Sequence, residues 1–503
     1  MTISVSGGAG GVGARLQDLR SEAGLLDAAG DDVRRWSGSV AAVAVHPEVA
    51  VATLLCPGEV AAVAGSVAAA SLGADGLLVL SARLEGTAVV LRASATTYEL
   101  VDSTQQRVLE ALHTAAGFAL GSALPLLAAG STLVALGVGL SAASTPSTWP
   151  ALVLAAQRID AARVPGALVG GLYDNPWLLE GLTRAAPGLV QGSTWSLGTL
   201  LGGPLGGVTV PYVLSGGRWP TASYEDAVGG LIHAGGLLGM FRDTGDVGVR
   251  QVEGDFTGHA PRSVEDIFTE QGSIGQLESW GQVQISEVRQ ADGTSSWIVQ
   301  VPGTQPWEPV RGGNPVDLTT NLRLMAGEPT HLGDQVRAAM VAAGIGLRDP
   351  VLLAGHSQGG ITAASLAADP AFRDRYDVRA VVTGGSPIAR FDIPGSVAVL
   401  ALEHDQDAVP MLEGRENPDR PSWITVERDL ARAPVGDPDP EHPEATQHAP
   451  PRHLGAAHGT DAYAQTGALV DASTDPSVRA WLDEQASFFR GGGTTTRWDV
   501  TTW

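Results

Sequence analysis

One serine of this chain stands where a nucleophile could form. Ser357 is the third residue of GHSQGG, residues 355–360, so glycine lies two positions before it and two positions after it. The apolar run 351–354 predicts a buried strand, and the run 361–368 predicts a helix. A sharp turn from strand to helix needs small neighbours, exposes the hydroxyl at the end of a sheet, and sets it beside a helix N-terminus that favours negative charge. We therefore predict that Ser357 is a catalytic nucleophile.

The motif alone would be weak, because glycine makes up 65 of the 503 residues. In so glycine-rich a chain, a chance Gly-x-Ser-x-Gly has roughly even odds. The flanking pattern carries the prediction instead, since no other serine here has glycine at both positions. Acid and histidine candidates also follow Ser357 in the chain.

The acid candidates follow the next predicted strand. Apolar residues at 396–402 predict a buried strand that ends in Glu403, Asp405 and Asp407. An acid at this end of a parallel strand would share a sheet edge with Ser357 and could orient a histidine. We predict Asp407, with Asp405 and then Glu403 as alternatives; a solvated loop is the competing interpretation.

The histidine candidates lie in a Pro-rich stretch, residues 431–459, and are His442, His448, His453 and His458. We favour His458, because it directly precedes a predicted helix from Asp461, and His453 comes second. The others would then be ordinary residues of a polar loop. Residues 431–457 are also a candidate lid over the site.

Acyl transfer needs hydrogen-bond donors for the oxyanion. The predicted strand 296–301 ends in PGTQPW, residues 302–307, which could bring the Thr304 hydroxyl beside Ser357. The N–H of Gln358, the residue after the nucleophile, would be the second donor. An ordinary Pro-Gly turn is the competing interpretation.

These segments together resemble the α/β-hydrolases, and within them the class 3 (fungal-type) lipases, over about residues 282–490. DLTTNL at 317–322, GGSP at 384–387 and DAVP at 407–410 add to the motifs above. The resemblance implies an α/β fold and hydrolysis of an ester or lipid substrate through an acyl-enzyme, with no cofactor and no metal. Pro302 replaces a common arginine and Gln358 a common leucine, which leaves the lipid substrate open. Esterases, thioesterases and acyltransferases use the same turn.

The first 250 residues are rich in Gly, Ala, Val and Leu, and their apolar spacing predicts helices. The predicted helices are 12–36, 57–70, 77–109, 150–162 and 224–241. Trp36-Ser37-Gly38 follows a predicted helix, and Tyr98 and Asp102 lie four apart on one helix face. This part resembles the WXG-type hairpins of type VII secretion substrates, which implies secretion machinery as a partner, although 62 residues between the motifs is long. Packing of Trp36 and Tyr98 in a core is the competing interpretation.

A second apolar feature follows. No residue between His113 and Arg158 is charged, and 118–142 is long enough to cross a bilayer. Pro125 and the glycines weaken a straight helix, so a buried hairpin remains the alternative to membrane contact.

The length predicts two or three domains: a helical region at 1–115, an apolar helical region at 116–250 and an α/β-hydrolase domain at 260–490. A net charge of −23 argues against nucleic acid and anionic membranes as partners. Cys56 is the only cysteine, so no internal disulfide or thiolate cluster can form. The N-terminus has no signal-peptide pattern, which leaves export by a signal-free route or membrane association open. We expect the glycine-rich residues 7–13 to be a flexible end.

Two functions are therefore predicted. The first is a serine esterase or lipase-like hydrolase that uses Ser357, Asp407 and His458. The alternative is a non-enzymatic secretion-associated or membrane-binding protein that carries an inactive hydrolase-like domain.

Overall fold

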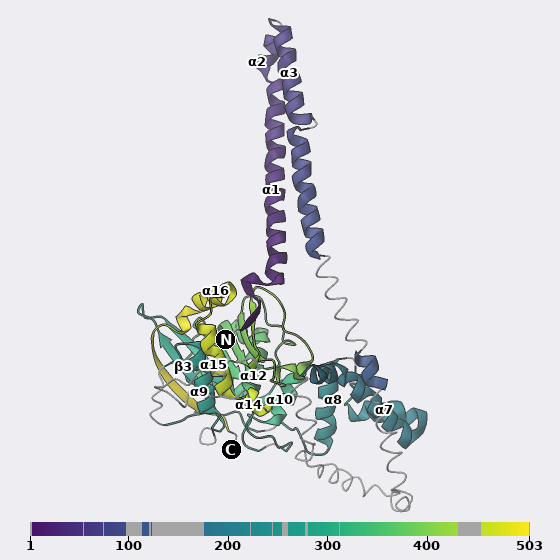
Figure 1. Cartoon of the computed structure of the whole chain (residues 1–503), viewed down its shortest axis with the longest axis vertical. Helices are drawn as coiled ribbons and strands as arrows, with labels where there is room; N and C mark the ends of the chain where they lie inside the picture. The colour runs from purple at the N-terminus through teal and green to yellow at the C-terminus, as the bar shows by residue number, and fades with distance from the viewer. Residues whose placement is uncertain are drawn as a thin grey trace, which may run out of the picture. The chain divides into compact units, whose positions relative to one another are not determined.

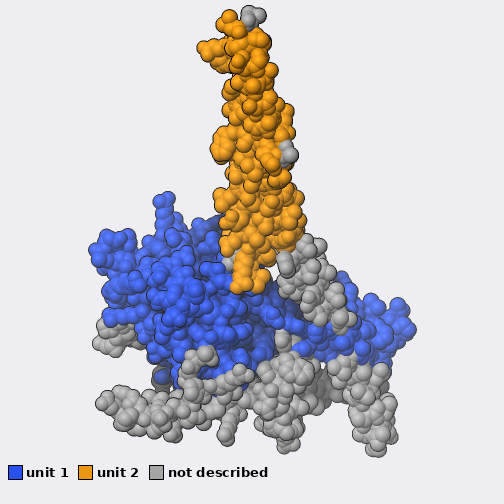
Figure 2. Space-filling model, turned by 45° about the horizontal axis from the view of Figure 1, so that its top comes forward, with its two compact units in different colours: residues 1–10, 110–503 blue, residues 11–109 orange. Residues whose placement is uncertain are grey.

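The computed structural model describes residues 3–53, 55–73, 75–96, 113–119, 122, 176–221, 223–243, 245–253, 260–276, 280–310, 312–430 and 454–501. The chain divides into two compact units, drawn in different colours in Figure 2. One unit is residues 11–109, and the other joins residues 1–10 to residues 110–503.

The larger unit is built on a mixed sheet (Figure 1), whose nine described strands have the order β1-β8-β7-β6-β5-β4-β3-β9-β2. The strands are β1 Ser4–Gly7, β2 Arg250–Gln251, β3 Gln282–Arg289, β4 Ser295–Val301, β5 Pro350–His356, β6 Asp377–Gly384, β7 Ala398–His404, β8 Trp423–Arg428 and β9 Gly492–Asp499. Strands β4 to β8 run parallel, and the outer pairings are antiparallel. The protein thus belongs to the α/β class.

Both faces of the parallel strands are covered, which explains their continuous apolar runs. In β4, Trp297 and Val299 face one hydrophobic core, while Ile298 between them faces the other. The first core includes residues of α11 His331–Ala342, α12 Gln358–Ala368 and α13 Pro370–Arg375. The second includes residues of α9 Val264–Ile274, α15 Thr460–Asp471 and α16 Pro476–Glu484. Ser263 caps α9, since its hydroxyl accepts from the Asp266 N–H at 3.0 Å.

A helical layer lies between β1 and β2 in the sequence and packs against helices of the larger unit. It consists of α7 Pro176–Leu214, which is interrupted by non-helical Gly202 and Gly203, and α8 Tyr224–Leu237. Helix α8 contacts α10 Leu318–Met325, and α7 contacts the short helix η5 Pro410–Glu413. Other short helices are η1 Gly8–Gly10, α14 Leu454–Ala457 and η7 Ala486–Phe488, and residues 113–119 are helical as well.

The N-terminal residues correct one expectation. The segment expected to be a flexible end follows β1, which pairs with β8 from Ser4↔Glu427 to Gly7↔Ile424. Gly7 has a φ of 73°, and a Cβ there would lie 2.0 Å from the Trp423 carbonyl oxygen, so the close approach requires glycine. The N–H of Gly10 then donates to Ser477 Oγ at 3.0 Å.

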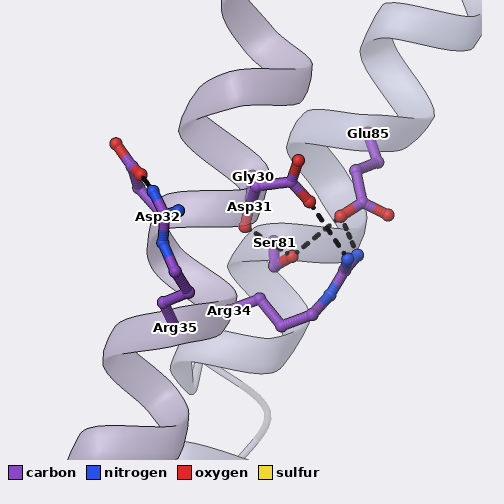
Figure 3. Close-up of polar contacts among 7 residues, drawn as sticks. All are labelled: Gly30, Asp31, Asp32, Arg34, Arg35, Ser81 and Glu85. Atoms are coloured by element: carbon purple, nitrogen blue, oxygen red, sulfur yellow. Dashed lines mark hydrogen bonds and ion pairs between the residues drawn. The ribbon is translucent and has the colours of Figure 1, made fainter.

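The smaller unit is a helical hairpin. Helix α1 Val12–Ala44 and the short α2 Pro47–Ala52 lead into α3 Pro57–Leu72, and a further helix spans 77–96. Alanines pack where α1 meets the last helix, and Ala23, Ala88 and Ala95 are fully buried. Figure 3 shows the polar contacts nearby: Ser81 Oγ donates to the Gly30 carbonyl at 2.9 Å, and Arg34 pairs with Glu85.

The Trp36 triplet differs from both expectations. Helix α1 continues to Ala44, so residues 36–38 lie within a helix and not after one. The Trp36 side chain is 59% exposed, so the interpretation as a core tryptophan is wrong. Tyr98 and Asp102 lie outside the described residues, so the secretion motif stays a prediction.

Among the other helix predictions, 57–70 and 224–241 correspond to α3 and α8, which end at Leu72 and Leu237. The helix predicted at 77–109 is described only to residue 96, and 150–162 lies outside the described residues. Nearly all of the candidate membrane span 118–142 also lies outside the described residues. Two segments are long and apolar enough to cross a membrane by length and composition alone: Pro57–Thr96, which takes in α3 and the helix at 77–96, and Thr183–Leu214 of α7.

The alanine contacts of the smaller unit generate a prediction. Ala88→Leu adds three carbon atoms where α1 and the helix 77–96 approach closely, and overpacking of this kind costs about 1–3 kcal/mol. We expect faster amide hydrogen exchange in peptides from 12–44 and 77–96, measured by mass spectrometry. The control is Val89→Leu at the neighbouring, exposed position. Equal exchange in the two variants would contradict the packing described.

Candidate active site

Ser357 lies in a strained turn between β5 and α12. Its φ of 54° and ψ of −122° are rare for a residue with a side chain, and its N–H donates to the Gly384 carbonyl at 2.9 Å. A Cβ at Gly355 would lie 2.1 Å from the Gly359 carbonyl carbon, and a Cβ at Gly359 would lie 1.8 Å from the Val301 oxygen. The two glycines of the motif are thus required by space, as the sequence predicted for a nucleophile turn.

The turn after β4 lies against the same elbow. A Cβ at Gly303 would lie 3.3 Å from Ser357 Cβ, so residues 302–304 pass beside the serine. The Thr304 hydroxyl accepts from Asn321 Nδ2 at 2.7 Å, which leaves its single hydrogen to donate elsewhere. The Gln358 N–H belongs to the first turn of α12, whose N–H groups have no acceptor within the helix. Both predicted oxyanion donors therefore border the turn.

The Gln358 side chain connects this turn to α10. It is fully buried, and its Nε2 donates to the carbonyl of Asp317, the N-cap residue of α10. The Gln305 N–H donates to the Val316 carbonyl at 2.9 Å, so the segment after β4 is fixed to the segment before α10. Gln358 thus has a structural role, because its side chain ties the turn to the start of α10.

Asp407 and His458 form a pair at the carboxyl ends of the parallel strands. His458 Nδ1 and Asp407 Oδ2 lie 2.7 Å apart, and Asp407 is almost completely buried. Tyr463 of α15 donates its hydroxyl to the same oxygen at 2.7 Å, while the Val409 N–H donates to Oδ1 at 2.9 Å. Burial alone would raise the pKa of Asp407, but the bond and charge of His458 and the two other donors outweigh it and lower the pKa. The carboxylate therefore stays ionised and fixes the imidazole.

Two buried histidines hold the backbone around His458. The ring of His404 stacks on Tyr463 with centroids 3.9 Å apart, and its Nδ1 donates to the Ala457 carbonyl at 2.8 Å. The Nε2 of His356 donates to the His458 carbonyl at 2.6 Å, and the two rings lie 4.5 Å apart. Burial lowers the pKa of His404 to about 4, and burial followed by the charge of His458 lowers that of His356 to about 3. Both rings are neutral at neutral pH.

Gly385 lies between the serine turn and the histidine–aspartate pair. It follows the residue that accepts the Ser357 N–H, and a Cβ there would lie 2.8 Å from Asp407 Oδ2 and 3.0 Å from His458 Nδ1. Its φ of 61° also favours glycine. The hydrogen bonds of the described residues do not include one between Ser357 Oγ and His458. All three predicted residues nevertheless lie at one edge of the sheet.

The two alternative acids, Asp405 and Glu403, suit the role of orienting the histidine less well than Asp407. Asp405 is exposed. Burial, and then the charge of Glu427, raises the pKa of Glu403 to about 8, and Asn417 Nδ2 donates to it at 2.6 Å. Since a protonated acid cannot stabilise an imidazolium, Asp407 is the acid that this geometry favours.

Other predicted residues cannot be placed. His442, His448 and His453, together with residues 431–453 of the candidate lid, lie outside the described residues. Sequence reasoning did not identify Tyr463, His356 and His404 as parts of the site. The only available signal was their position: His356 and His404 end buried strands, and Tyr463 follows His458 by five residues on a predicted helix.

Comparisons of the chain with protein-family models, with curated proteins and with solved structures find no match. A functional assignment must therefore be argued from the geometry of this site.

The crowded elbow gives a prediction. Gly359→Ala places a methyl group where the Val301 oxygen lies, so β4 or the elbow must shift. We expect at least about a tenfold slower reaction of Ser357 with a fluorophosphonate probe, measured by gel labelling, with a lower melting temperature. The control is Gly236→Ala in α8, where a Cβ has open space and alanine favours a helix. Normal labelling of Gly359→Ala would contradict the required close approach.

The neutral His404 gives a pH prediction. Because its folded pKa is below the ordinary 6.5, the unfolded chain binds a proton first, so this residue's contribution to stability is complete above pH 6.5 and is lost as pH falls toward 4. The total is on the order of 3 kcal/mol. We expect His404→Gln to lose less stability than wild type between pH 7 and pH 5 in urea unfolding.

The variant must be compared with wild type because other groups change the stability in the opposite direction with pH. These groups are Glu270, Glu403 and Glu413. Burial raises each of their pKa values to about 8, so their contributions fall as pH rises. These groups remain in the variant and cancel in the difference. Equal losses of stability in wild type and His404→Gln would show that His404 takes up its proton equally in both states.

Proposed function

We propose that this protein is a serine hydrolase that cleaves carboxylic esters through an acyl-enzyme. The observation that carries the proposal is the strained backbone of Ser357, which begins α12 at the sheet edge that also carries Asp407 and His458. Strain of this kind costs about 1–3 kcal/mol and is retained where it has a use. A hydroxyl that attacks a carbonyl carbon, held at the same sheet edge as a histidine fixed by a buried carboxylate, is such a use.

In the first half of the reaction, Ser357 Oγ attacks the ester carbonyl carbon while His458 Nε2 takes the hydroxyl proton. Asp407 holds Nδ1–H by the 2.7 Å contact and stabilises the imidazolium without taking its proton. The carbonyl oxygen becomes an oxyanion, for which the Gln358 N–H and the Thr304 hydroxyl are the proposed donors.

Collapse of the tetrahedral intermediate breaks the bond to the alcohol oxygen, which leaves with the proton from His458. The acyl group remains on Ser357. Water then attacks the acyl carbon as its proton passes to His458, and the acid leaves when that proton returns to Ser357 Oγ. The cycle restores the serine, the neutral histidine and the carboxylate.

The arrangement of the larger unit supports an α/β-hydrolase fold as part of this proposal. Its central strands run parallel, the turn after β5 carries the serine, the turn after β7 carries the acid, and the histidine precedes α15. The resemblance to class 3 lipases favours an ester of a fatty acid, although the same chemistry suits smaller acyl esters.

The test combines covalent labelling with turnover. We expect a fluorophosphonate to modify Ser357, identified by mass spectrometry, and Ser357→Ala to lose both labelling and at least about 10³-fold of the turnover of p-nitrophenyl esters while keeping its circular dichroism spectrum. His458→Asn and Asp407→Asn should also label slowly.

The matched control is Ser365→Ala, which removes a hydroxyl from the same helix two turns beyond the elbow. It should label and turn over normally. Labelling at another serine, or unchanged turnover in Ser357→Ala, would exclude Ser357 as the nucleophile.

A further inference from the structure

Part of α7 is a helical hairpin without charge. From residue 185 to residue 217 the chain contains no Asp, Glu, Lys, Arg or His. Gly202 and Gly203 are non-helical and break α7 into the arms 176–201 and 204–214. The arms fold back on one another, since a Cβ at Gly198 would lie 2.3 Å from the Gly206 oxygen. Residues 185–214 are called the α7 hairpin below.

In the α7 hairpin the small residues are buried and the large apolar side chains are exposed, which is the opposite of the packing in a water-soluble protein. Its glycines at 188, 192, 198, 206 and 207 are buried, and a Cβ at Gly207 would lie 2.3 Å from Thr199 Oγ1. Its large apolar side chains point outward, and Leu205 near the tip is 80% exposed. The exposed set is Val190, Trp195, Leu197, Leu200, Leu201, Leu205, Val208, Tyr212 and Val213. Small residues between helices and large apolar residues outside are typical of helices surrounded by lipid.

The polar groups of the hairpin are suited to the same surroundings. The helical backbone of each arm satisfies most of its own N–H and C=O groups, as lipid requires; the break at Gly202 and Gly203 and the prolines of α7 are the exceptions. The threonine hydroxyls bond to carbonyls of the preceding turn: Thr194 to Val190 at 2.7 Å, Thr199 to Trp195 at 2.8 Å and Thr209 to Leu205 at 2.9 Å. Insertion into lipid would therefore leave few polar groups without a partner.

The base of the hairpin is attached to the edge of the candidate active site. Arg184 Nε donates to the Gly414 carbonyl at 3.1 Å, seven residues beyond Asp407. At the other end, Arg218 pairs with Glu328 at 2.9 Å, just after α10. Both bounding arginines thus contact the sheet-bearing part of the chain, and the uncharged α7 hairpin lies between them.

We propose that the α7 hairpin inserts into one leaflet of a neutral phospholipid bilayer and docks the protein there. The shorter arm, 11 residues, is about 16 Å long, roughly half of the hydrocarbon thickness, so the hairpin enters a leaflet without crossing the membrane. The hairpin lacks cations for anionic headgroups, and the chain carries a net charge of −23, so a neutral surface is the one that its charge fits. Aromatic Trp195 and Tyr212 suit the interfacial region of such a leaflet.

The experiment is flotation of the full chain with phosphatidylcholine vesicles. We expect wild type to float with the vesicles, and the double variant Leu201→Asp/Leu205→Asp to lose at least tenfold of the bound fraction. The matched control is Leu25→Asp/Val45→Asp, which adds the same charge at exposed apolar residues of the smaller unit and should float normally. Circular dichroism checks that all three proteins are folded.

A second measurement reports on the tip itself. In a Cys56→Ser background, Leu205→Cys carries the only thiol, and an attached environment-sensitive fluorophore should shift to the blue on addition of vesicles. A fluorophore at Leu25→Cys should not shift. These measurements do not depend on ester hydrolysis. Their outcome therefore tests membrane binding separately from the proposed hydrolase activity.

Three outcomes would overturn the proposal. One is equal loss of flotation in both double variants. Another is absence of flotation together with a dimer, measured by light scattering, that Leu201→Asp/Leu205→Asp dissociates, because a second copy would then cover the hairpin. The third is a fluorophore at 205 that is already blue-shifted without vesicles, because a segment of the same chain, such as residues 123–175, would then cover it.

Discussion

The close approach of three backbone segments at Ser357 is the constraint on which the rest of the site depends. Gly359 touches the Val301 carbonyl, Gly355 touches Gly359, and the Ser357 N–H bonds to Gly384. These contacts bring the ends of β4, β5 and β6 together around one residue with a positive φ. Since the neighbouring strands are parallel and hydrogen-bonded in register, the strained turn cannot relax without breaking the sheet locally.

A second set of interactions turns this sheet edge into a polar site with defined charges. Asp407 is ionised because His458, Val409 and Tyr463 all donate to it, whereas His404 and His356 are kept neutral by burial. Neutral rings can each donate to one carbonyl, and they do so at consecutive residues, Ala457 and His458. The loop that carries His458 is therefore positioned by groups that add no competing positive charge next to the imidazole.

Much of this arrangement could be predicted from sequence, because it depends on local patterns. The elbow, the strand before Asp407 and the helix after His458 each show in spacing, glycine placement or an apolar run. The α/β class is shown in the mixed sheet, while the hydrolase assignment stays a prediction. Tyr463 and His404 could not be assigned roles, because their contacts join residues 53 or more positions apart and depend on the register of the whole sheet.

Other parts were missed for identifiable physical reasons. Strand β1 is four residues long and ends in glycines, so it shows no alternation, and only its pairing with β8 makes it a strand. Helix α7 contains Pro187, Pro204 and Pro211, which normally interrupt a helix and obscured the pattern. Helix α1 was expected to end near Trp36, but it continues through Gly38 because its partner helices extend past that residue.

The helical layer and the site edge are one structural unit, and this connects the two proposals. Glu413 accepts the N–H groups of Ala389 at 2.8 Å and Arg390 at 3.0 Å, so the segments following β6 and β7 are tied together. The Arg390 guanidinium in turn lies 4.6 Å from the ring centroid of Tyr224, the first residue of α8. Because α8 packs on α7, a force on the α7 hairpin at a membrane would act on the segments that carry Gly385 and Asp407. The α7 hairpin is thus connected to the segments that carry Gly385 and Asp407 without a flexible linker, so the proposed membrane contact and the proposed nucleophile would belong to one packed unit.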